Sequence, residues 1–483
     1  MPESPSRVAR KVRLRVRLIG SDPEVWRLFE VPRSARLGQL HRVLQCVMGW
    51  TDSHLHAFTT AEPYAWPRAD DARRWEDLTI PGFAWSEGDE PDDEDATSVG
   101  ELLREGSPPL YYEYDFGDGW VHAVEWVADG AAEPGPGWIG EIVEGGGLCP
   151  QEDSGGLPGW CQLVDAVADP ANPDRVRLKM WAAGSISPDG LIHPERFDRE
   201  AASKRLAQAG ALDAYQREFE NRAEAPTLFD KLMQPLAWGQ RMWLARQFEI
   251  DPAFLSCADP GQVDNLGDIA PDVLDRMTRH YRWLLGRIGD NGLALTKAGY
   301  LPPAVVREAY VELGFNEELL EGRQVREGDS GPVAALRMSA QELGLLRKTR
   351  GVLHVTRDAA KAASDPVVLL RFMIRRLANK GPERIDQVLT ALVALGLAFA
   401  DEWDEDEFWD AIAEWAGGIG WRLSSGEPLK GPDVRAIAGW ARAFLMTTGA
   451  LIEAGGWTEG YTITPGAGGR ELARAVLVAP VKA

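Results

Sequence analysis

The segment that most constrains this chain is residues 111–122, where alternating aromatic residues surround a glycine-rich turn. If residues 117–119 form a three-residue hairpin loop, Gly119 supplies the left-handed backbone position that such loops need. The facing pairs are then Phe116 with Trp120, Tyr114 with His122, and Tyr112 with Val124. The segment therefore predicts a hairpin with a strongly aromatic buried face, and Asp115 points away from that face.

Length and composition limit the class of protein. The chain has 483 residues, which predicts two to four domains. No apolar run approaches the roughly 20 residues that span a bilayer, and no apolar segment of a secretory signal follows the basic N-terminus. The 4 cysteines are too few for a disulfide framework. We therefore expect a cytoplasmic protein with reduced thiols and no membrane partner.

The first part of the chain mixes strand and helix patterns. Strands are expected at residues 12–18, 25–31 and 54–58, and helices at residues 37–48, 158–168 and 198–209. In the first of these helices the apolar residues recur at spacings of three and four, which is typical of a helix packed on one side. We expect an α+β domain over residues 1–218, in which packed helices cover a mixed sheet.

The rest of the chain is dominated by helix patterns. Residues 220–226 are the best linker candidate, and strand signals are rare after them. Helices are expected at residues 271–285, 303–313, 332–343, 365–377 and 432–451. Asp365 followed by Pro366 is a strong helix start, because an N-cap carboxylate is followed by proline at the first turn. We predict a mostly α-helical region over residues 227–483.

Three short segments of this helical region resemble one another, and they begin at Gly292, Gly351 and Gly460. Each has a glycine turn, a short apolar strand and a threonine, which can cap a following helix. Short strands of this kind form the wing of winged-helix domains. One interpretation is two winged-helix units, at about residues 227–362 and 363–483. The other is helical packing units with incidental hairpins, which the long connection before Pro332 favours.

Charge is distributed unevenly. The net charge of −22 opposes binding to nucleic acid, because phosphate contacts depend on Lys and Arg. Residues 331–380, however, contain 10 basic and 3 acidic side chains, a local balance of 10 − 3 = +7. A local basic surface can bind DNA even on an acidic chain. The candidate phosphate contacts, which would fix position rather than sequence, are Arg347, Lys348, Arg350, Arg371, Arg375 and Arg376.

Histidines and carboxylates near the aromatic segment form a second candidate site. The candidate ligand or metal face comprises His54, His56, Asp115, Asp118, Glu152 and Asp153. His54 and His56 lie two apart, so on a strand both side chains point to one face. The spacing matches no zinc motif, and structural histidines are the alternative. Glu152 and Asp153 have two interpretations: acid–base or magnesium-binding carboxylates, or groups that fix the loop and cap the next helix.

Taken in order, several segments resemble the plasmid pRiA4b ORF-3-like family over residues 11 to about 210. The matching segments are residues 24–27, 40–41, 49–50, 54–58, 114–122 and 152–156. The resemblance implies an α+β domain that is often found beside mobile elements, and it implies no established activity. The family usually has a cysteine where Ser154 stands, and the loss of this cysteine weakens the inference of a shared metal or redox site.

Three functions are compatible with these observations. The favoured hypothesis is a non-enzymatic binding or accessory protein, linked to mobile elements or DNA, whose second half meets DNA or a protein partner. The alternative is an enzyme that acts on phosphate esters or nucleic acid with a divalent metal as cofactor. The third is a protein–protein interaction module built on a tryptophan-rich surface.

Overall fold

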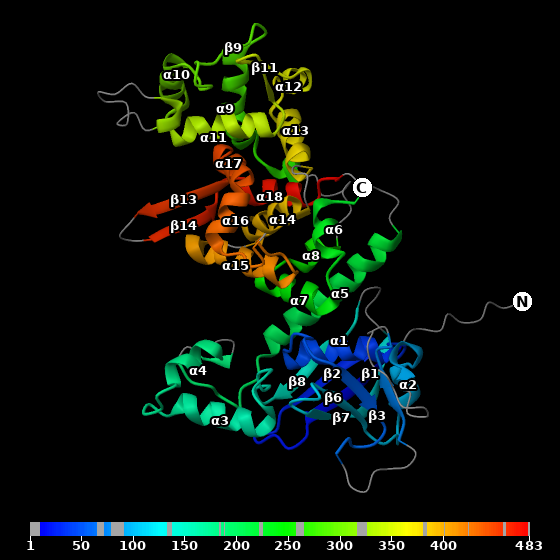
Figure 1. Cartoon of the computed structure of the whole chain (residues 1–483). Helices are drawn as coiled ribbons and strands as arrows, with labels where there is room; N and C mark the ends of the chain where they lie inside the picture. The colour runs from blue at the N-terminus through cyan, green and yellow to red at the C-terminus, as the bar shows by residue number, and fades with distance from the viewer. Residues whose placement is uncertain are drawn as a thin grey trace, which may run out of the picture. The chain divides into compact units, whose positions relative to one another are not determined.

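The computed structural model describes most of the chain. The described residues are 10–64, 72–78, 91–132, 138–182, 185–187, 189–221, 226–256, 265–315, 326–379, 384–399, 401–423, 425–456 and 460–481. They form two compact units (Figure 1). The first unit comprises Met1–Glu220 and Ala237–Arg246, and the second comprises Asn221–Leu236 and Gln247–Ala483.

The first unit is built on a mixed eight-stranded sheet with the order β5-β4-β3-β6-β7-β1-β2-β8. The strands are β1 Arg10–Leu18, β2 Trp26–Pro32, β3 His56–Thr59, β4 Arg74–Glu76, β5 Asp92–Asp93, β6 Leu110–Tyr114, β7 Trp120–Ala132 and β8 Glu141–Gly146. Only β4 and β5 are parallel neighbours among these described strands. In β1 the apolar residues Val12, Leu14 and Val16 are fully buried, as strict alternation predicts.

Six helices belong to the described part of this unit. They are α1 Leu37–Met48, α2 Val99–Leu102, α3 Gly156–Ala168, α4 Arg175–Trp181, α5 Arg199–Asn221 and α7 Trp238–Gln247, with a 3-10 turn η1 at Glu94–Ala96. Helix α1 lies along the sheet (Figure 1), and its stripe of Leu37, Leu40, Leu44 and Val47 is buried. The periodicity that predicts a helix at residues 37–48 therefore also identifies its buried face.

The hairpin of β6 and β7 differs from its predicted register. Tyr114 pairs with Trp120 and Tyr112 pairs with His122, so each partner is shifted by two residues. The loop has five residues, 115–119, because Asp115 Oδ1 accepts hydrogen bonds from the backbone N–H groups of Gly117 (3.0 Å) and Asp118 (3.3 Å). Phe116 therefore lies in the loop with 36% of its surface exposed, and the prediction that it faces Trp120 is wrong. The left-handed position of Gly119 is confirmed, with φ of 68°.

The second unit repeats one order of elements. The first module has α9 Pro271–Ile288, β9 Leu293–Ala294, α10 Pro303–Leu313, α11 Gly331–Glu342, β10 Leu346–Thr349 and β11 Val352–Val355. The second module has α14 Arg384–Phe399, β12 Trp403–Asp404, α15 Glu405–Gly418, α16 Gly431–Ile437, α17 Gly439–Thr447, β13 Leu451–Gly456 and β14 Gly460–Pro465. Their sheets have the orders β10-β11-β9 and β12-β14-β13, so in each module the first strand pairs with the last.

This arrangement explains the repeated glycine segments of the sequence. The segments at Gly351 and Gly460 become β11 and β14, which hold equivalent places in the two modules. The segment at Gly292 becomes β9, which pairs with β11 instead of occupying an equivalent place. Between and around the modules lie α6 Leu228–Met233, α8 Pro252–Ser256, η3 Asn265–Asp268, η5 Glu327–Asp329, α12 Arg357–Ala362, α13 Pro366–Ala378 and α18 Gly469–Leu477.

The predicted fold class, an α+β part followed by a largely helical part, is confirmed. The helix expected at residues 432–451 is interrupted at Ala438, ahead of Gly439, and forms α16 and α17. The predicted cap is present, since the Asp365 carboxylate accepts hydrogen bonds from the N–H groups of Val367 and Val368. None of the described helices combines the length and the apolar character needed to cross a membrane.

Candidate functional site

Three loops of the first unit converge beside the aromatic hairpin: residues 50–55 after α1, residues 115–119 between β6 and β7, and residues 150–155 before α3. Trp50 Nε1 donates a hydrogen bond to the carbonyl oxygen of Pro150 (2.9 Å), which joins the first loop to the third. The N–H of Gly155 donates to Asp118 Oδ2 (3.1 Å), which joins the third loop to the second. We call the region where they meet the three-loop site.

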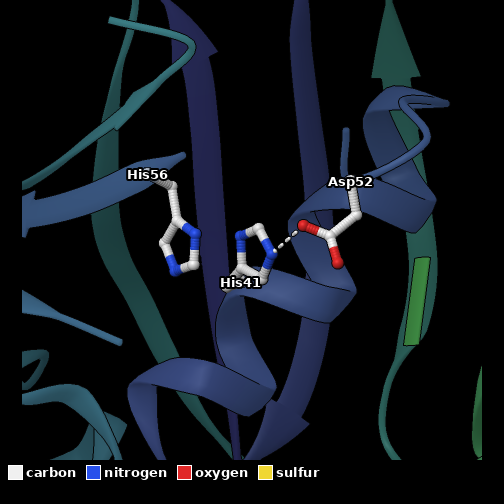
Figure 2. A group of neighbouring side chains, drawn as sticks. All are labelled: His41, Asp52 and His56. Atoms are coloured by element: carbon white, nitrogen blue, oxygen red, sulfur yellow. Dashed lines mark hydrogen bonds and ion pairs between the residues drawn. The ribbon is translucent and has the colours of Figure 1, made fainter. Parts of the chain in front are cut away.

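A pair of stacked histidines lies on the sheet side of this region (Figure 2). His41 comes from α1 and His56 from β3, and their rings are 3.5 Å apart with planes only 4° from parallel. Each ring has its own carboxylate: His41 Nε2 is 2.8 Å from Asp52 Oδ1, and His56 Nε2 is 2.8 Å from Glu94 Oε2. Burial and the neighbouring His56 lower the pKa of His41 below its ordinary value.

His41, Asp52 and His56 place potential metal-ligand atoms within 4.8 Å of one another. An imidazole nitrogen binds a metal along its lone pair, which lies in the plane of the ring. The rings are stacked with centres 3.5 Å apart and planes 4° from parallel, so their in-plane lone pairs lie in separate layers and cannot meet at one ion. Since each ring is also hydrogen bonded to a carboxylate, this pair has the features of structural histidines.

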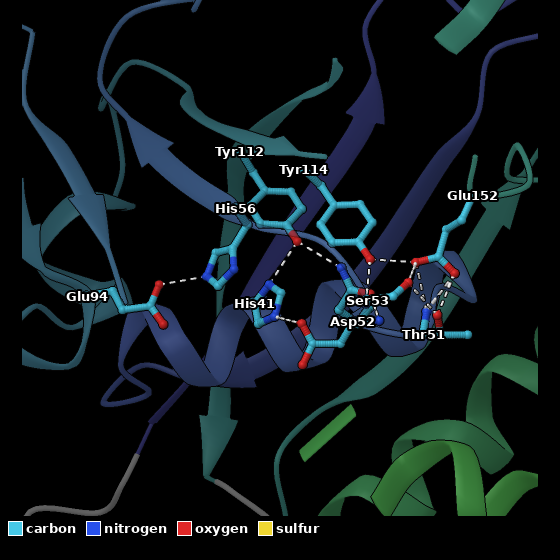
Figure 3. A network of polar contacts seen from close by, with 10 residues as sticks. His41, Thr51, Asp52, Ser53, His56, Glu94, Tyr112, Tyr114 and Glu152 are labelled. Carbon is cyan, nitrogen blue, oxygen red and sulfur yellow. Dashed lines mark hydrogen bonds and ion pairs between the residues drawn. The ribbon is translucent and has the colours of Figure 1, made fainter. Parts of the chain in front are cut away.

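The polar network continues from His41 through the aromatic face (Figure 3). Gln45 Nε2 donates to the hydroxyl of Tyr112 (3.0 Å), and this hydroxyl lies 2.8 Å from His41 Nδ1. The hydroxyl therefore donates to Nδ1, and Nε2–H of His41 donates to Asp52, which assigns the tautomer from the network. Burial raises the pKa of Tyr112 well above its ordinary value, so the phenol stays protonated.

Glu152 fixes the loops to one another. Its carboxylate accepts hydrogen bonds from the backbone and hydroxyl of Thr51, from the hydroxyl of Ser53, and from Tyr114 at 2.5 Å (Figure 3). Burial and this carboxylate raise the pKa of Tyr114 above its ordinary range. With its oxygens occupied in this way, Glu152 holds the geometry of the three-loop site.

His54 has different surroundings. Its Nδ1 lies 3.6 Å from Asp115 Oδ2, and its Nε2 lies 3.4 Å from Asp153 Oδ1. Both distances are longer than an ordinary hydrogen bond, and the buried Nε2 has no hydrogen-bond partner. Asp115 and Asp153 have φ values of 55° and 62°, a left-handed conformation that L-residues adopt at a cost.

The six residues predicted for this site thus fall into separate groups. The structure brings together His54, Asp115 and Asp153. Asp118 and Glu152 hold the surrounding loops, and His56 joins His41 and Glu94. Two features of the site are not predicted from the sequence: the polar network of Gln45 and Tyr112, and the contact between His41 and His56. A signal was available, since His41 and Gln45 are polar residues four apart on an otherwise apolar face of α1.

In the second unit the basic candidates lie on β10, its turn and α13. Arg347, Lys348, Thr349 and Arg350 are all exposed, and the turn into β11 is formed by Arg350 (φ 50°) and Gly351 (φ 80°). We call residues 346–355 the basic hairpin. Arg371, Arg375 and Arg376 are exposed on α13. A Cβ atom built at Gly344 would lie 3.8 Å from Arg376 Cζ, which places this guanidinium close to the start of β10.

Most other arginines with a described partner in this unit form ion pairs. They pair as Arg276–Asp272, Arg282–Asp275, Arg287–Glu308, Arg337–Glu327, Arg435–Glu405, Arg442–Glu453 and Arg470–Asp401. By contrast, Arg347, Lys348, Arg350, Arg375 and Arg376 have no carboxylate partner in the part of the chain that the structure describes. Their positive charge is therefore available to a ligand.

The first unit is an α+β domain whose three-loop site lies beside the sheet, and the second unit is mostly helical. The family model for plasmid pRiA4b ORF-3-like protein matches residues 10–201. The uncharacterized protein y4hQ of Sinorhizobium fredii (strain NBRC 101917 / NGR234) is 36% identical over 181 residues, which cover 37% of this chain and 84% of that protein. The chain belongs to the plasmid pRiA4b ORF-3-like family.

A solved structure is also similar. It is the crystal structure of a protein of unknown function, MM3350, from Methanosarcina mazei Go1. Its sequence is 24% identical, the match covers 40% of this chain and 97% of that chain, and the TM-score is 0.32.

Proposed function

We propose that this protein is a non-enzymatic, DNA-binding accessory protein whose second unit contacts the phosphate backbone. The observation that carries the proposal is the set of exposed cations without acidic partners on the basic hairpin. Phosphate binding is driven by such cations, because each neutralised phosphate releases condensed counterions. An association with mobile elements is a further prediction from the family resemblance.

The order of elements supports this proposal. The first module runs helix, strand, helix, helix, strand, strand, the second module has one more helix between its first two strands, and in each the first strand pairs with the last. The order in the first module is that of a winged-helix domain, with α11 in the place of the recognition helix and the basic hairpin in the place of the wing. Wings commonly lie against the DNA backbone, so a basic wing is the part of such a module that phosphates would reach.

Arg350 gives a second line of support. A two-residue turn with positive φ at both central positions favours Asn, Asp or Gly at the first of them. This chain has an arginine there, with φ of 50°. Residues in costly backbone conformations are concentrated at functional sites, and a long cation at the tip of a hairpin is well placed to reach a phosphate.

The exposed residues of α11 favour contacts to the DNA backbone over contacts to base edges. Its exposed positions include Pro332 and Met338, neither of which pairs with base edges as Arg, Asn or Gln does. The helix also packs against α17 of the second module (Figure 1). We therefore infer that DNA binding is largely independent of base sequence and strongly dependent on salt.

The experiment is a salt titration of binding, with the full-length protein and a labelled DNA duplex of random sequence. The test variant carries Arg347→Ala, Lys348→Ala and Arg350→Ala. The matched control carries Arg276→Ala, Arg282→Ala and Arg287→Ala, which removes the same number of cations but from existing ion pairs. Each lost phosphate contact lowers the slope of log K against log salt by about 0.9, so the test variant should lose up to about 3 units of slope.

The control variant should keep the affinity and slope of the wild type. No binding by the wild type at low salt would overturn the proposal, as would a slope that the test substitutions leave unchanged. Binding that persists in the test variant, together with capture of a nuclease-resistant protein partner, would favour the interaction-module alternative.

A further inference from the structure

We propose that His54, Asp115 and Asp153 form a binding site for a divalent transition-metal ion, best matched by Zn²⁺. The site belongs to the first unit and does not depend on DNA binding by the second. One nitrogen of His54 and one oxygen from each carboxylate lie within 4.8 Å of one another. The three residues come from the three converging loops, so the folded chain assembles the group.

The spacing of these atoms suits ligands of one ion better than it suits direct hydrogen bonds. Asp153 Oδ1 lies 3.4 Å from His54 Nε2, and Asp115 Oδ2 lies 3.6 Å from the other nitrogen, Nδ1, whereas an N–H to oxygen hydrogen bond is about 2.7–3.2 Å long. An imidazole binds one ion through one nitrogen, so the 3.4 Å spacing at Nε2 is the one to compare with ligands of a shared ion. Zinc bonds to nitrogen and oxygen are about 2.0–2.2 Å long, so neighbouring ligands in a tetrahedron are about 3.4 Å apart. Asp115 Oδ2, which faces Nδ1 and lies within 4.8 Å of the other two ligand atoms, would move toward the ion to complete the coordination.

The other histidine–carboxylate pairs of the first unit provide a contrast. His41, His56 and His193 approach their carboxylates to 2.8, 2.8 and 2.7 Å, which are ordinary charge-assisted hydrogen bonds. His54 Nε2 is buried and makes no hydrogen bond, although Asp153 is near. Ser154 Oγ, next in the chain to Asp153, is also buried without a partner. Buried polar atoms of this kind normally have partners, and an ion bound at Nε2 would supply the one that His54 lacks.

The protein holds the three residues in place without using the atoms that would bind the ion. Asp115 accepts the N–H groups of Gly117 and Asp118 with Oδ1, which leaves Oδ2 directed at His54. The ring of His54 packs edge-on against Tyr114, with ring centres 5.8 Å apart. The side chain of Asp153 is 72% exposed, so an ion can reach the site from solvent.

The donor set determines the kind of ion. Two carboxylates supply a charge of −2, which balances a divalent cation. Ca²⁺ and Mg²⁺ prefer sets made of oxygen alone, and an imidazole nitrogen shifts the preference toward Zn²⁺ and similar ions. Three protein ligands would leave a fourth position for water, as in zinc sites with an open coordination position.

The test is metal titration of the full-length protein after removal of metal with a chelator. Calorimetry with Zn²⁺ measures affinity and stoichiometry, and the visible absorption of Co²⁺ reports coordination geometry. We expect about one tight equivalent in the wild type. His54→Ala and Asp153→Asn should each weaken this binding by about tenfold or more.

His193→Ala is the matched control, because His193 lies between Asp189 and Glu195 but has hydrogen-bond or ion-pair contacts at both nitrogens. It should bind Zn²⁺ as the wild type does. Asp153 is exposed, so Asp153→Asn should fold normally, and it decides the question if His54→Ala is unstable. Absence of stoichiometric binding, or equal affinity in Asp153→Asn and the wild type, would overturn the proposal. Tighter binding of Ca²⁺ or Mg²⁺ than of Zn²⁺ would also overturn it.

Discussion

In the first unit, His41, His56, Tyr112 and Glu94 are buried and each is hydrogen bonded to another side chain of the same network. In the second unit, the cations of the basic hairpin are exposed and have no acidic partner among the described residues. Burying a polar group costs free energy unless a hydrogen bond replaces its contact with water. The requirement for a stable fold is therefore enough to explain the hydrogen bonds among these buried residues.

The hairpin cations cannot be explained in the same way. An exposed charge contributes little to stability even when it is paired, and these charges are not paired. Their concentration on one hairpin of an otherwise acidic chain is what the proposed binding of an anionic ligand would explain. Substitutions in the two regions should therefore affect different properties. Those in the first unit should change stability, and those in the basic hairpin should change binding.

The largest effect that we expect is that of His41→Ala. The substitution removes the hydrogen-bond partner of Tyr112 and Asp52 and the stacking partner of His56. Breaking a buried pair by removing one partner typically costs about 3–5 kcal/mol. Urea denaturation followed by tryptophan fluorescence should show this loss, and DNA binding should be unchanged. Arg347→Ala is the control, and its unfolding free energy should stay within about 0.5 kcal/mol of the wild type.

Acidification should act on the first unit next most strongly. Complete burial lowers the pKa of His122 from 6.5 to about 4. Between these values the unfolded chain binds a proton that the folded chain does not, so stability decreases as pH falls from about 6.5 to 4. A shift of this size corresponds to on the order of 3 kcal/mol. Equilibrium denaturation at several pH values measures the loss.

His122→Gln tests the assignment of this pH dependence. Glutamine does not titrate, and its amide can donate to the carbonyl oxygen of Tyr112 in place of Nδ1–H. The variant should therefore lose the contribution of His122 to the change in unfolding free energy between pH 6.5 and 4, while His41, whose pKa is also lowered, keeps its own. An unchanged pH dependence would assign it to other groups.

The two regions also differ in how far they could be predicted from the sequence. Local chemistry was sufficient for α1, whose apolar spacing gives its bounds, and for the Asp365 cap of α13. It was also sufficient to expect a glycine turn and a short strand at Gly351 with basic residues just before them, because turn, strand and charge lie within one short segment. Features that depend on neighbouring residues alone are read directly from the chain.

The three-loop site depended on contacts between distant elements. Its members His54, Asp115 and Asp153 were expected as part of a larger set, but the stacking of His41 on His56 requires knowing how α1 packs on β3. The predicted register of the hairpin was wrong for a local reason, since the Asp115 side chain accepts hydrogen bonds from two backbone N–H groups and lengthens the loop. A glycine motif alone does not reveal that competing interaction.

Arg350→Asn should have the smallest effect on stability. It distinguishes the two regions most sharply, because stability and DNA binding should change in opposite directions. Asparagine tolerates the left-handed backbone better than arginine, so the variant should be more stable by roughly 0.5–1 kcal/mol. It also removes one cation, so DNA affinity should fall and the salt slope should decrease by about 0.9. Thermal melting and the salt titration measure both. Stability that rises while binding falls would mean that Arg350 is kept for a ligand at the cost of strain, whereas binding equal to that of the wild type would remove Arg350 from the DNA contact.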